Sequence, residues 1–419
     1  MESFRRFLSN RQKSIKIQFM KNKKLNIFKY ICAISVITYI TLLFNEPTGT
    51  QLMVFYGETT DFFADFFNCM RLVADKDPYN SLALAPGDRI YLPFSYLILY
   101  PFSRFCNYSN LTLNECYTQT PALISCLLFS LITISIYIHA IILLLKKYRV
   151  SFLFIIPIIC SSIFLYSIER GTLVFVSASC IIYYILYHNS KNIILSYFAI
   201  ICLCIATTLK IYPALFGILL LKNKSYKKIL FCILLTSLLV LLPFLFFKGG
   251  FNNLIILFNN FQESIALYSP NRIYERYSIS HLTYLFCNFL NISNSVIQIS
   301  ISIIKYIIIF ISILSLYLSL CTKKYYNSLF LILCVLLYLP ANSGLYCGLY
   351  IIPIIIIYLS IPSSQISLSV LIAFGIILMP IQIRYVNISI TYLLSNICLL
   401  YLWGYFIQNT LFSLLNNKK

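Results

Sequence analysis

Long apolar runs, separated by short segments that carry lysine and arginine, constrain this chain more than any other feature of its sequence. Of its 419 residues, 60% are hydrophobic and only 11% are charged, a composition that cannot provide an ordinary water-facing surface. A bilayer core about 30 Å thick is crossed by roughly 20 apolar residues in a helix. We therefore predict an all-α polytopic membrane protein with about 11 to 12 transmembrane helices. The candidate spans lie near 27–45, 121–145, 151–168, 171–188, 192–209, 211–221, 228–247, 301–320, 327–341, 343–361, 366–383 and 388–407.

The basic residues cluster in alternate loops between these runs. Clusters around Lys146, Lys222 and Lys323, and the basic N-terminus, are cytoplasmic by the positive-inside rule. The cytoplasmic segments then hold 21 of the 32 lysines and arginines but a single acid, Glu2, whereas the external segments hold 11 residues of each sign. The formal charge of +20 therefore reports membrane topology, so that the partner is a lipid bilayer and no nucleic acid is expected.

This alternation places both termini in the cytoplasm and leaves two long external segments. Pro93 and Pro101 interrupt an apolar stretch in the first segment that is too short to span the membrane, which predicts interfacial or re-entrant helices. Loops of this kind commonly cover a site at the membrane surface. The predicted regions are a basic N-terminus at 1–26, a first transmembrane helix at 27–45, an external catalytic loop at 46–120, transmembrane helices two to seven at 121–247, a second external loop at 248–300, helices eight to twelve at 301–407, and a cytoplasmic C-terminus at 408–419.

Two acids four residues apart, Asp61 and Asp65, form the strongest local feature. If the chain is helical from Thr60 onward, both acids share one face while neighbouring phenylalanines form an apolar band. A carboxylate held against an apolar surface has a raised proton affinity, as a general base requires. The alternative is an interfacial helix whose acids simply face water, and the residues alone leave both interpretations open.

External cations near the ends of the spans form a second feature. The segment 192–221 has lysine at both flanks and must cross an even number of times, which predicts two short helices that meet at Lys210. A cation at such a break is costly unless it meets an anion or lines a polar cavity, so we expect a lipid-phosphate ligand, with simple snorkelling as the alternative. The other external cations and the one external histidine are Arg170, Arg272, Arg276, Arg384 and His281.

Most of the 15 cysteines lie inside apolar runs and form no paired CxxC motif, as expected of small core residues. Cys106 and Cys116 lie in the first external segment, where a disulfide is possible in an oxidising compartment, and the sequence leaves that bridge open. No set of His, Cys and carboxylate side chains has metal-ligand spacing. We expect no cofactor, although the acid pair leaves a divalent cation open.

Several short motifs follow one another in a fixed order: Asp61-Phe62, Asp77-Pro78-Tyr79, Tyr91-Leu92-Pro93, Glu169-Arg170-Gly171, Leu209-Lys210-Ile211-Tyr212-Pro213, the polar stretch 278–281 and the aromatic stretch 346–353. This order resembles the membrane glycosyltransferases of the C superfamily (GT-C) and is most similar to glycosyltransferase family 87, the DUF2029 group. Two positions depart from the family pattern. Tyr91-Leu92-Pro93 has one of two expected prolines, and Asp65 stands where an aromatic residue is common, which leaves open whether Asp61 or Asp65 does the chemistry.

The resemblance implies a GT-C-type fold and an inverting hexosyltransferase that uses a polyprenyl-phosphate sugar donor and a glycolipid or polysaccharide acceptor. It implies a bacterial inner (plasma) membrane, with the active site on the external, periplasmic side, and a role in cell-envelope polysaccharide such as O-antigen. Asp61 would be the general base, with Asp65 as the other catalytic candidate. Lys210, Arg170 and Arg384 would bind the donor phosphate. The implied substrate-binding residues are Asp77, Tyr79, Tyr212, Arg272, Arg276 and His281.

Two other classes of protein fit parts of the pattern. An O-antigen polymerase or ligase would use the 248–300 loop, with Arg272, Arg276 and His281. A transporter of lipid-linked sugars would need charged residues deep within several spans, and these are almost absent here. The sequence leaves open the sugar, whether mannose, glucose, galactose or arabinose, as well as the acceptor and the oligomeric state.

Overall fold

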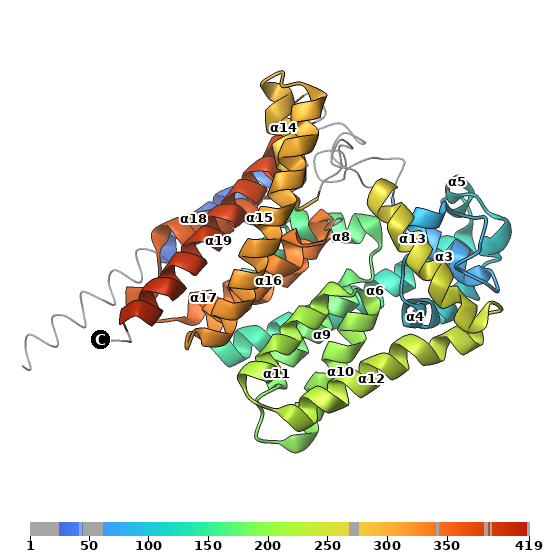
Figure 1. Cartoon of the computed structure of the whole chain (residues 1–419), viewed down its shortest axis with the longest axis horizontal. Coiled ribbons are helices and arrows are strands. Elements are labelled where there is room, and N and C mark those ends of the chain that lie inside the picture. The colour runs from blue at the N-terminus through green and yellow to red at the C-terminus, as the bar shows by residue number, and fades with distance from the viewer. Residues whose placement is uncertain are drawn as a thin grey trace, which may run out of the picture.

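The computed structural model describes residues 25–41, 44, 62–267, 276–340, 343–380, 384–385 and 388–416 as a bundle of helices (Figure 1), which confirms an all-α polytopic membrane protein. Within these described ranges, four helical segments are long and apolar enough to cross a membrane: Thr120–Tyr148, Tyr226–Phe246, Asn294–Cys321 and Tyr392–Asn416. A fifth candidate is the pair Phe152–Ile159 and Ser162–Arg170, which is bent by 58°. The described residues also form seven shorter apolar helices, and each of the twelve predicted apolar runs overlaps one of these segments.

The apolar helices follow the predicted runs, and short 3-10 helices (η) lie at several of the breaks. The first described helix is Leu25–Thr41. The external segment then carries α3 (Ala64–Ala74), η2 (Pro86–Asp88), α4 (Pro93–Ser103), η3 (Tyr108–Asn110) and α5 (Leu113–Cys116). Next come α6 (Thr120–Tyr148), η4 (Phe152–Phe154), α7 (Ile155–Ile159), α8 (Ser162–Arg170), α9 (Val174–Tyr187), α10 (Ile193–Leu209), η5 (Tyr212–Gly217), α11 (Ile218–Lys222), α12 (Tyr226–Leu241) and η6 (Leu242–Phe246).

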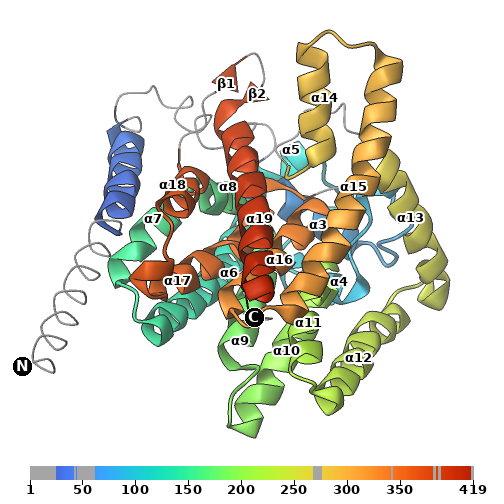
Figure 2. The same ribbon diagram turned by 60° about the vertical axis from the view of Figure 1, so that its left-hand side comes forward.

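The second half of the chain contains both long helices and irregular segments (Figure 2). Its elements are η7 (Gly250–Asn252), α13 (Asn253–Leu267), α14 (Ile279–Phe289), α15 (Asn294–Cys321), α16 (Tyr325–Tyr338), η8 (Leu345–Tyr350), α17 (Ile352–Ser360), η9 (Ser363–Gln365), α18 (Leu368–Ile377), β1 (Arg384–Tyr385), β2 (Ile388–Ser389) and α19 (Ile390–Asn416). The two-residue strands β1 and β2 pair antiparallel before α19 begins.

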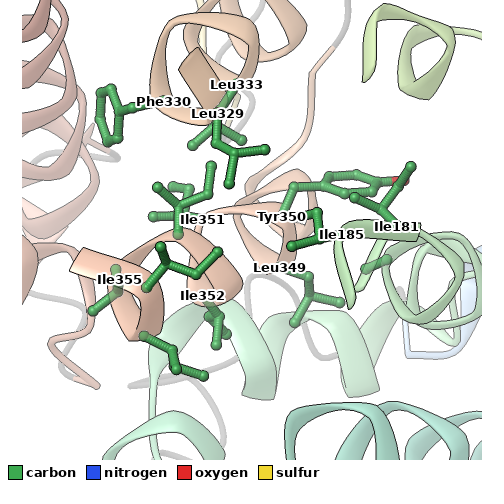
Figure 3. Close-up of a cluster of buried hydrophobic side chains, with 14 of the residues drawn as sticks. Ile181, Ile185, Leu329, Phe330, Leu333, Leu349, Tyr350, Ile351, Ile352 and Ile355 are labelled. Carbon is green, nitrogen blue, oxygen red and sulfur yellow. The ribbon is translucent and has the colours of Figure 1, made fainter. Parts of the chain in front are cut away.

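The main core surrounds α16. From Leu329 to Leu337 every residue of this helix is fully buried, as expected of a helix that is apolar on all sides. Figure 3 shows side chains of α16 meeting those of η8 and α17 and the labelled residues Ile181 and Ile185 of α9. The irregular segment η8 therefore lies inside the protein, where its neighbours can satisfy a backbone that is not regular α-helix.

Parts of the two long segments that are predicted to be external pack together, namely α3 to α5 of the first and α13 of the second, and we call them the external unit. Figure 1 shows α13 on the same side of the molecule as α3, α4 and α5. The Asn253 side chain donates a hydrogen bond to Asp77 Oδ1 at 2.8 Å. A Cβ on Gly87 would lie only 3.1 Å from the backbone nitrogen of Ser264, so η2 and α13 are in close contact. The helices α3 and α4 have 11 residues each, which is too short to span a bilayer.

Cys106 and Cys116 both lie in the external unit. Cys116 is buried and Cys106 is half-buried, and each is a free thiol in this structure.

Gly171 couples α8 to α3 and yields a test of this packing. Its φ is +61°, and an added Cβ would lie 2.8 Å from the Cβ of Phe66. We expect Gly171→Ala to destabilise the fold by about 1–3 kcal/mol, because it combines backbone strain with a clash between two fixed elements. Thermal unfolding of the detergent-solubilised protein should show a lower midpoint.

Gly404→Ala is the matched control, because a Cβ at Gly404 would meet no atom within 4 Å. An unchanged midpoint for Gly171→Ala would contradict the close approach of α3 and α8.

Candidate functional site

Arg170 and Asp65 form an ion pair between the last residue of α8 and the first turn of α3. The Arg170 guanidinium donates from Nη2 to Asp65 Oδ1 at 2.5 Å and from Nε to the same oxygen at 3.2 Å. Both side chains are partly accessible, with 18% and 17% of their area exposed. A charge-assisted contact of this length holds the two helices in one relative position.

The backbone around this ion pair is fixed from both sides. Phe63 takes a left-handed conformation, with φ of 50°, just before α3. Its amide donates to the carbonyl of Glu169 at 2.5 Å. On the other side of Arg170, Gly171 has a positive φ that lets the chain turn sharply away from α8. The sequence Glu169-Arg170-Gly171 therefore presents the arginine at a helix end clamped to α3.

Lys210 lies at the break between α10 and η5. Its backbone is extended, with φ of −148° and ψ of 128°, so the predicted interruption falls at this residue. The Nζ atom lies 4.4 Å from the ring centroid of Tyr91 and 5.6 Å from that of Tyr346. It also donates to the Tyr91 hydroxyl at 3.3 Å. Two aromatic rings thus cover the ammonium group and stabilise it electrostatically.

The segment η8 packs beside both cations, Arg170 and Lys210. Tyr346 of η8 stacks on Tyr166 of α8, with ring centroids 6.3 Å apart and planes tilted by 11°. Tyr166 precedes Arg170 by one helical turn, so both lie on one face of α8. The next residue of η8, Cys347, lies 3.1 Å from the Tyr212 hydroxyl, and Tyr350 donates to Ser177 at 2.7 Å.

Seven side chains of this region, each of them half-buried, form what we call the tyrosine-lined site. Its members are Asp65, Tyr91, Tyr166, Arg170, Lys210, Tyr212 and Tyr346. Half-burial at helix ends leaves these groups both partly accessible and partly desolvated, which strengthens their interaction with a charged ligand. The site therefore suits an anion that carries an aromatic-stacking or apolar group.

Two neutral groups border the charges on α3 and its neighbouring loop. Burial, reinforced by the negative charge of Asp65, raises the pKa of the Cys69 thiol to about 12. Burial also raises the pKa of Tyr91 well above its ordinary value, with the Cys69 thiolate, where it forms, and the charge of Asp65 acting in the same direction. Both groups are therefore protonated at neutral pH, so Cys69 is not a nucleophile.

Asp77 and Tyr79, the predicted substrate-binding residues of the first loop, lie in the joint between the two external segments. Asp77 accepts hydrogen bonds from Asn80 and Asn253, each at 2.8 Å. Tyr79 is fully buried, and its hydroxyl donates to the carbonyl of Tyr91 at 3.0 Å. Its own carbonyl accepts from Arg89 at 3.0 Å. In this structure Tyr79 thus supports the backbone that carries Tyr91.

The other predicted site residues lie in or near the second external segment and η8. Arg276 forms a backbone bridge with Gly344, just before η8, and its side chain is buried. His281 is also buried, in the first turn of α14, where its amide donates to the N-cap Ser278. Arg384 lies in β1. Asp61 and Arg272 lie outside the residues that the structure describes.

The structure thus brings together Asp65, Arg170, Lys210 and Tyr212 from the sequence-predicted set. Sequence reasoning gave no role to Tyr166 or Cys347. The spacing of Tyr166 and Arg170 is a signal that could have identified the tyrosine, since residues four apart share a helix face. For Cys347 the sequence holds no comparable signal, because the residue reaches Tyr212 only through the tertiary fold.

Neither a metal cluster nor the cavity beside helix Leu25–Thr41 marks a second site in the part of the chain that is described. Among those residues, no group of three or more His, Cys, Asp or Glu side chains could hold a metal ion. A cavity of about 790 Å³ lies between helix Leu25–Thr41 and α6, α7 and α17. No predicted site residue lines it.

Comparison with known proteins gives one result. A family model, glycosyltransferase family 87, matches residues 90–340, a range that includes Tyr91, Arg170 and Lys210. No curated protein and no solved structure matches the chain.

The buried hydroxyl of Tyr79 gives a test of the joint. We expect Tyr79→Phe to lower stability by about 0.5–1.5 kcal/mol, because it removes a buried hydrogen bond and leaves the Tyr91 carbonyl without this donor. The midpoint of thermal unfolding in detergent measures the effect. Tyr100→Phe, at a half-exposed ring of α4, should leave the midpoint unchanged. Equal midpoints for the two variants would show that the Tyr79 hydroxyl does not support the joint.

Proposed function

The chain belongs to glycosyltransferase family 87, and we propose that this membrane glycosyltransferase moves a hexose from a polyprenyl-phosphate carrier to a glycolipid or polysaccharide acceptor. The reaction would invert the anomeric carbon, and Asp61 would be the general base. O-antigen is one acceptor class of this kind.

The observation that supports the proposal most is the convergence of two cations on one tyrosine. Lys210 lies 5.6 Å from the ring of Tyr346, and the same ring stacks on Tyr166, one turn before Arg170. Both cations lie at helix ends beside apolar helices. A sugar phosphate attached to a lipid tail needs this combination, because its phosphate is charged while its tail must remain in an apolar environment.

The proposed step moves one proton and one pair of bonding electrons. The acceptor oxygen forms a bond to the anomeric carbon, and its proton passes to the Asp61 carboxylate. The bond between the anomeric carbon and the phosphate oxygen breaks, and its electrons stay on that oxygen. Polyprenyl phosphate therefore leaves with one more negative charge than it had as a diester. Lys210 and Arg170, with Arg384 as a third candidate, would offset that charge.

The sugar itself would lie against tyrosine rings. The chain has 34 tyrosines and a single tryptophan, and Trp403 is buried in α19. Tyr91, Tyr166 and Tyr346 are half-buried in the tyrosine-lined site, so each ring is partly accessible. Aromatic faces pack on the apolar face of a hexose, which favours these rings as sugar contacts.

The proposed location is the external, periplasmic side of a bacterial inner membrane, with both termini in the cytoplasm. Arg170 ends α8, Lys210 follows α10 and Tyr346 is the second residue of η8. These three positions are the ends that the predicted topology places outside, next to the external unit. The charge pattern of the loops supports the same orientation.

Transfer of label from a panel of radiolabelled polyprenyl-phosphate sugars to an acceptor extract tests the proposal. We expect membranes that contain the protein to consume one donor. Asp61→Asn should lower the rate about 10²- to 10⁴-fold through loss of the base. Lys210→Ala should lower it about 10²- to 10³-fold through loss of charge stabilisation.

Glu263→Gln is the control, because Glu263 is an exposed carboxylate of α13 in the external unit. If no donor is consumed and Asp61→Asn still complements a null strain, the transferase proposal fails. Loss of function only on substitution of Arg272, Arg276 or His281 would instead indicate a polymerase or ligase. Movement of a lipid-linked sugar across vesicles without transfer would indicate a transporter.

We also propose that the reaction needs no metal cofactor, because Lys210 and Arg170 supply positive charge to the leaving phosphate. Transfer should therefore continue at an unchanged rate after incubation with EDTA. Loss of transfer that Mg²⁺ or Mn²⁺ restores would show that a divalent cation takes part.

A further inference from the structure

We propose that Asp65 is a positioning residue, which orients the Arg170 guanidinium toward the donor phosphate, and that it is not the base. This inference rests on the proposed function, since it assigns a role to a residue of the same site. It separates the roles of two acids that lie only four residues apart in the sequence.

The hydrogen bonds that Asp65 accepts from Arg170 are the first observation that supports this inference. One carboxylate oxygen, Oδ1, accepts from both Nη2 and Nε of Arg170, at 2.5 and 3.2 Å. A general base must offer an oxygen to the hydroxyl that it deprotonates, within hydrogen-bond reach. Proton transfer to Oδ1 would require this oxygen to give up a charge-assisted contact that both partners hold in a partly buried setting.

The second observation is that the backbone itself fixes the relative position of Asp65 and Arg170. The Phe63 amide is bonded to the Glu169 carbonyl, and Gly171 leaves no room for a Cβ beside Phe66. These contacts lie on either side of Arg170 and hold the first turn of α3 against the end of α8. Arginine has several rotatable bonds, so a fixed carboxylate beside it selects one orientation of the guanidinium in advance.

The third observation concerns the balance of charge in the tyrosine-lined site. Among the charged side chains of the tyrosine-lined site that the structure describes, Asp65, Arg170 and Lys210 have a formal charge of +1, and a phosphodiester donor has a charge of −1. Without Asp65, two cations would share a half-buried site and would repel each other before the donor binds. Asp65 therefore lets both cations remain in the site, and it leaves Lys210, covered by Tyr91 and Tyr346, as the uncompensated charge of the three.

The test uses full-length protein in lipid-supplemented detergent and the donor that the wild type consumes. The variants are Asp65→Asn, Asp65→Ala, Arg170→Ala and the double variant Asp65→Ala with Arg170→Ala. We expect kcat for Asp65→Asn to stay within about threefold of wild type while the donor KM rises about tenfold. Asp65→Ala should raise KM further, because asparagine keeps an oxygen for Arg170 and alanine does not. The double variant should be no worse than Arg170→Ala, as expected if Asp65 acts through Arg170.

A loss of about 100-fold or more in kcat for both Asp65 variants, with KM unchanged, would overturn the inference and make Asp65 the base. Unchanged kcat and KM for Asp65→Ala would overturn it as well. Thermal midpoints establish that each variant is folded, and Asp65→Asn preserves the test if Asp65→Ala does not fold.

A binding arm separates this inference from the proposed function. Radiolabelled undecaprenyl phosphate, which cannot be turned over, is titrated against wild type, Asp65→Ala and Arg170→Ala. Weaker binding by both variants to a similar degree would support positioning even if no sugar donor is consumed, in which case only the proposed transfer fails. Equal binding by wild type and Asp65→Ala would overturn the inference even if transfer occurs.

Discussion

A cation at a helix break inside an apolar bundle must be covered by other groups, and this requirement organises the structure around Arg170 and Lys210. Arg170 is neutralised by Asp65 on α3, and Lys210 is covered by the rings of Tyr91 and Tyr346. Each covering group comes from a different part of the chain. The external unit, α8, the α10–η5 break and η8 are therefore held in one arrangement by the demands of two side chains.

The external unit gives this arrangement its rigidity. Asn253 bonds to Asp77, and Asn260 donates to the carbonyls of Tyr79 and Arg89 at 3.4 and 3.2 Å. These contacts join α13 to the loop that leads to Tyr91. Neither α3 nor α4 is long enough to cross a membrane, so their stability depends on packing against α13 and the end of α6 rather than on the bilayer. The position of Tyr91 over Lys210 thus depends on residues from both external segments.

Much of the fold could be predicted from the sequence because the bilayer fixes the length of each apolar run. The break at Lys210 was also predictable, since a lysine and Pro213 interrupt a run too long for one helix and barely long enough for two. The site was predictable only in part. Charge and position identified Arg170, Lys210 and Asp65, but neither indicates that Arg170 pairs with Asp65. Tyr346 and Cys347 approach Lys210 and Tyr212 from far along the chain, and no local pattern records such contacts. The polar groups of the motif Asp77-Pro78-Tyr79 could bind a ligand, or they could equally form hydrogen bonds inside the protein. Only the packing of α13 shows that they lie in the joint between the two segments.

Tyr91 and Tyr346, whose rings cover Lys210, are synthesised at different times. Chains are synthesised and begin to fold from the N-terminus, so Tyr91 already exists when Lys210 leaves the ribosome, whereas Tyr346 does not. The nearer of the two rings, at 4.4 Å, is the earlier one. The nascent chain can therefore shield this ammonium group during membrane insertion with a partner that is already made, and the arrival of η8 completes the enclosure. A chain built in this order completes the tyrosine-lined site only after most of its apolar helices have been synthesised.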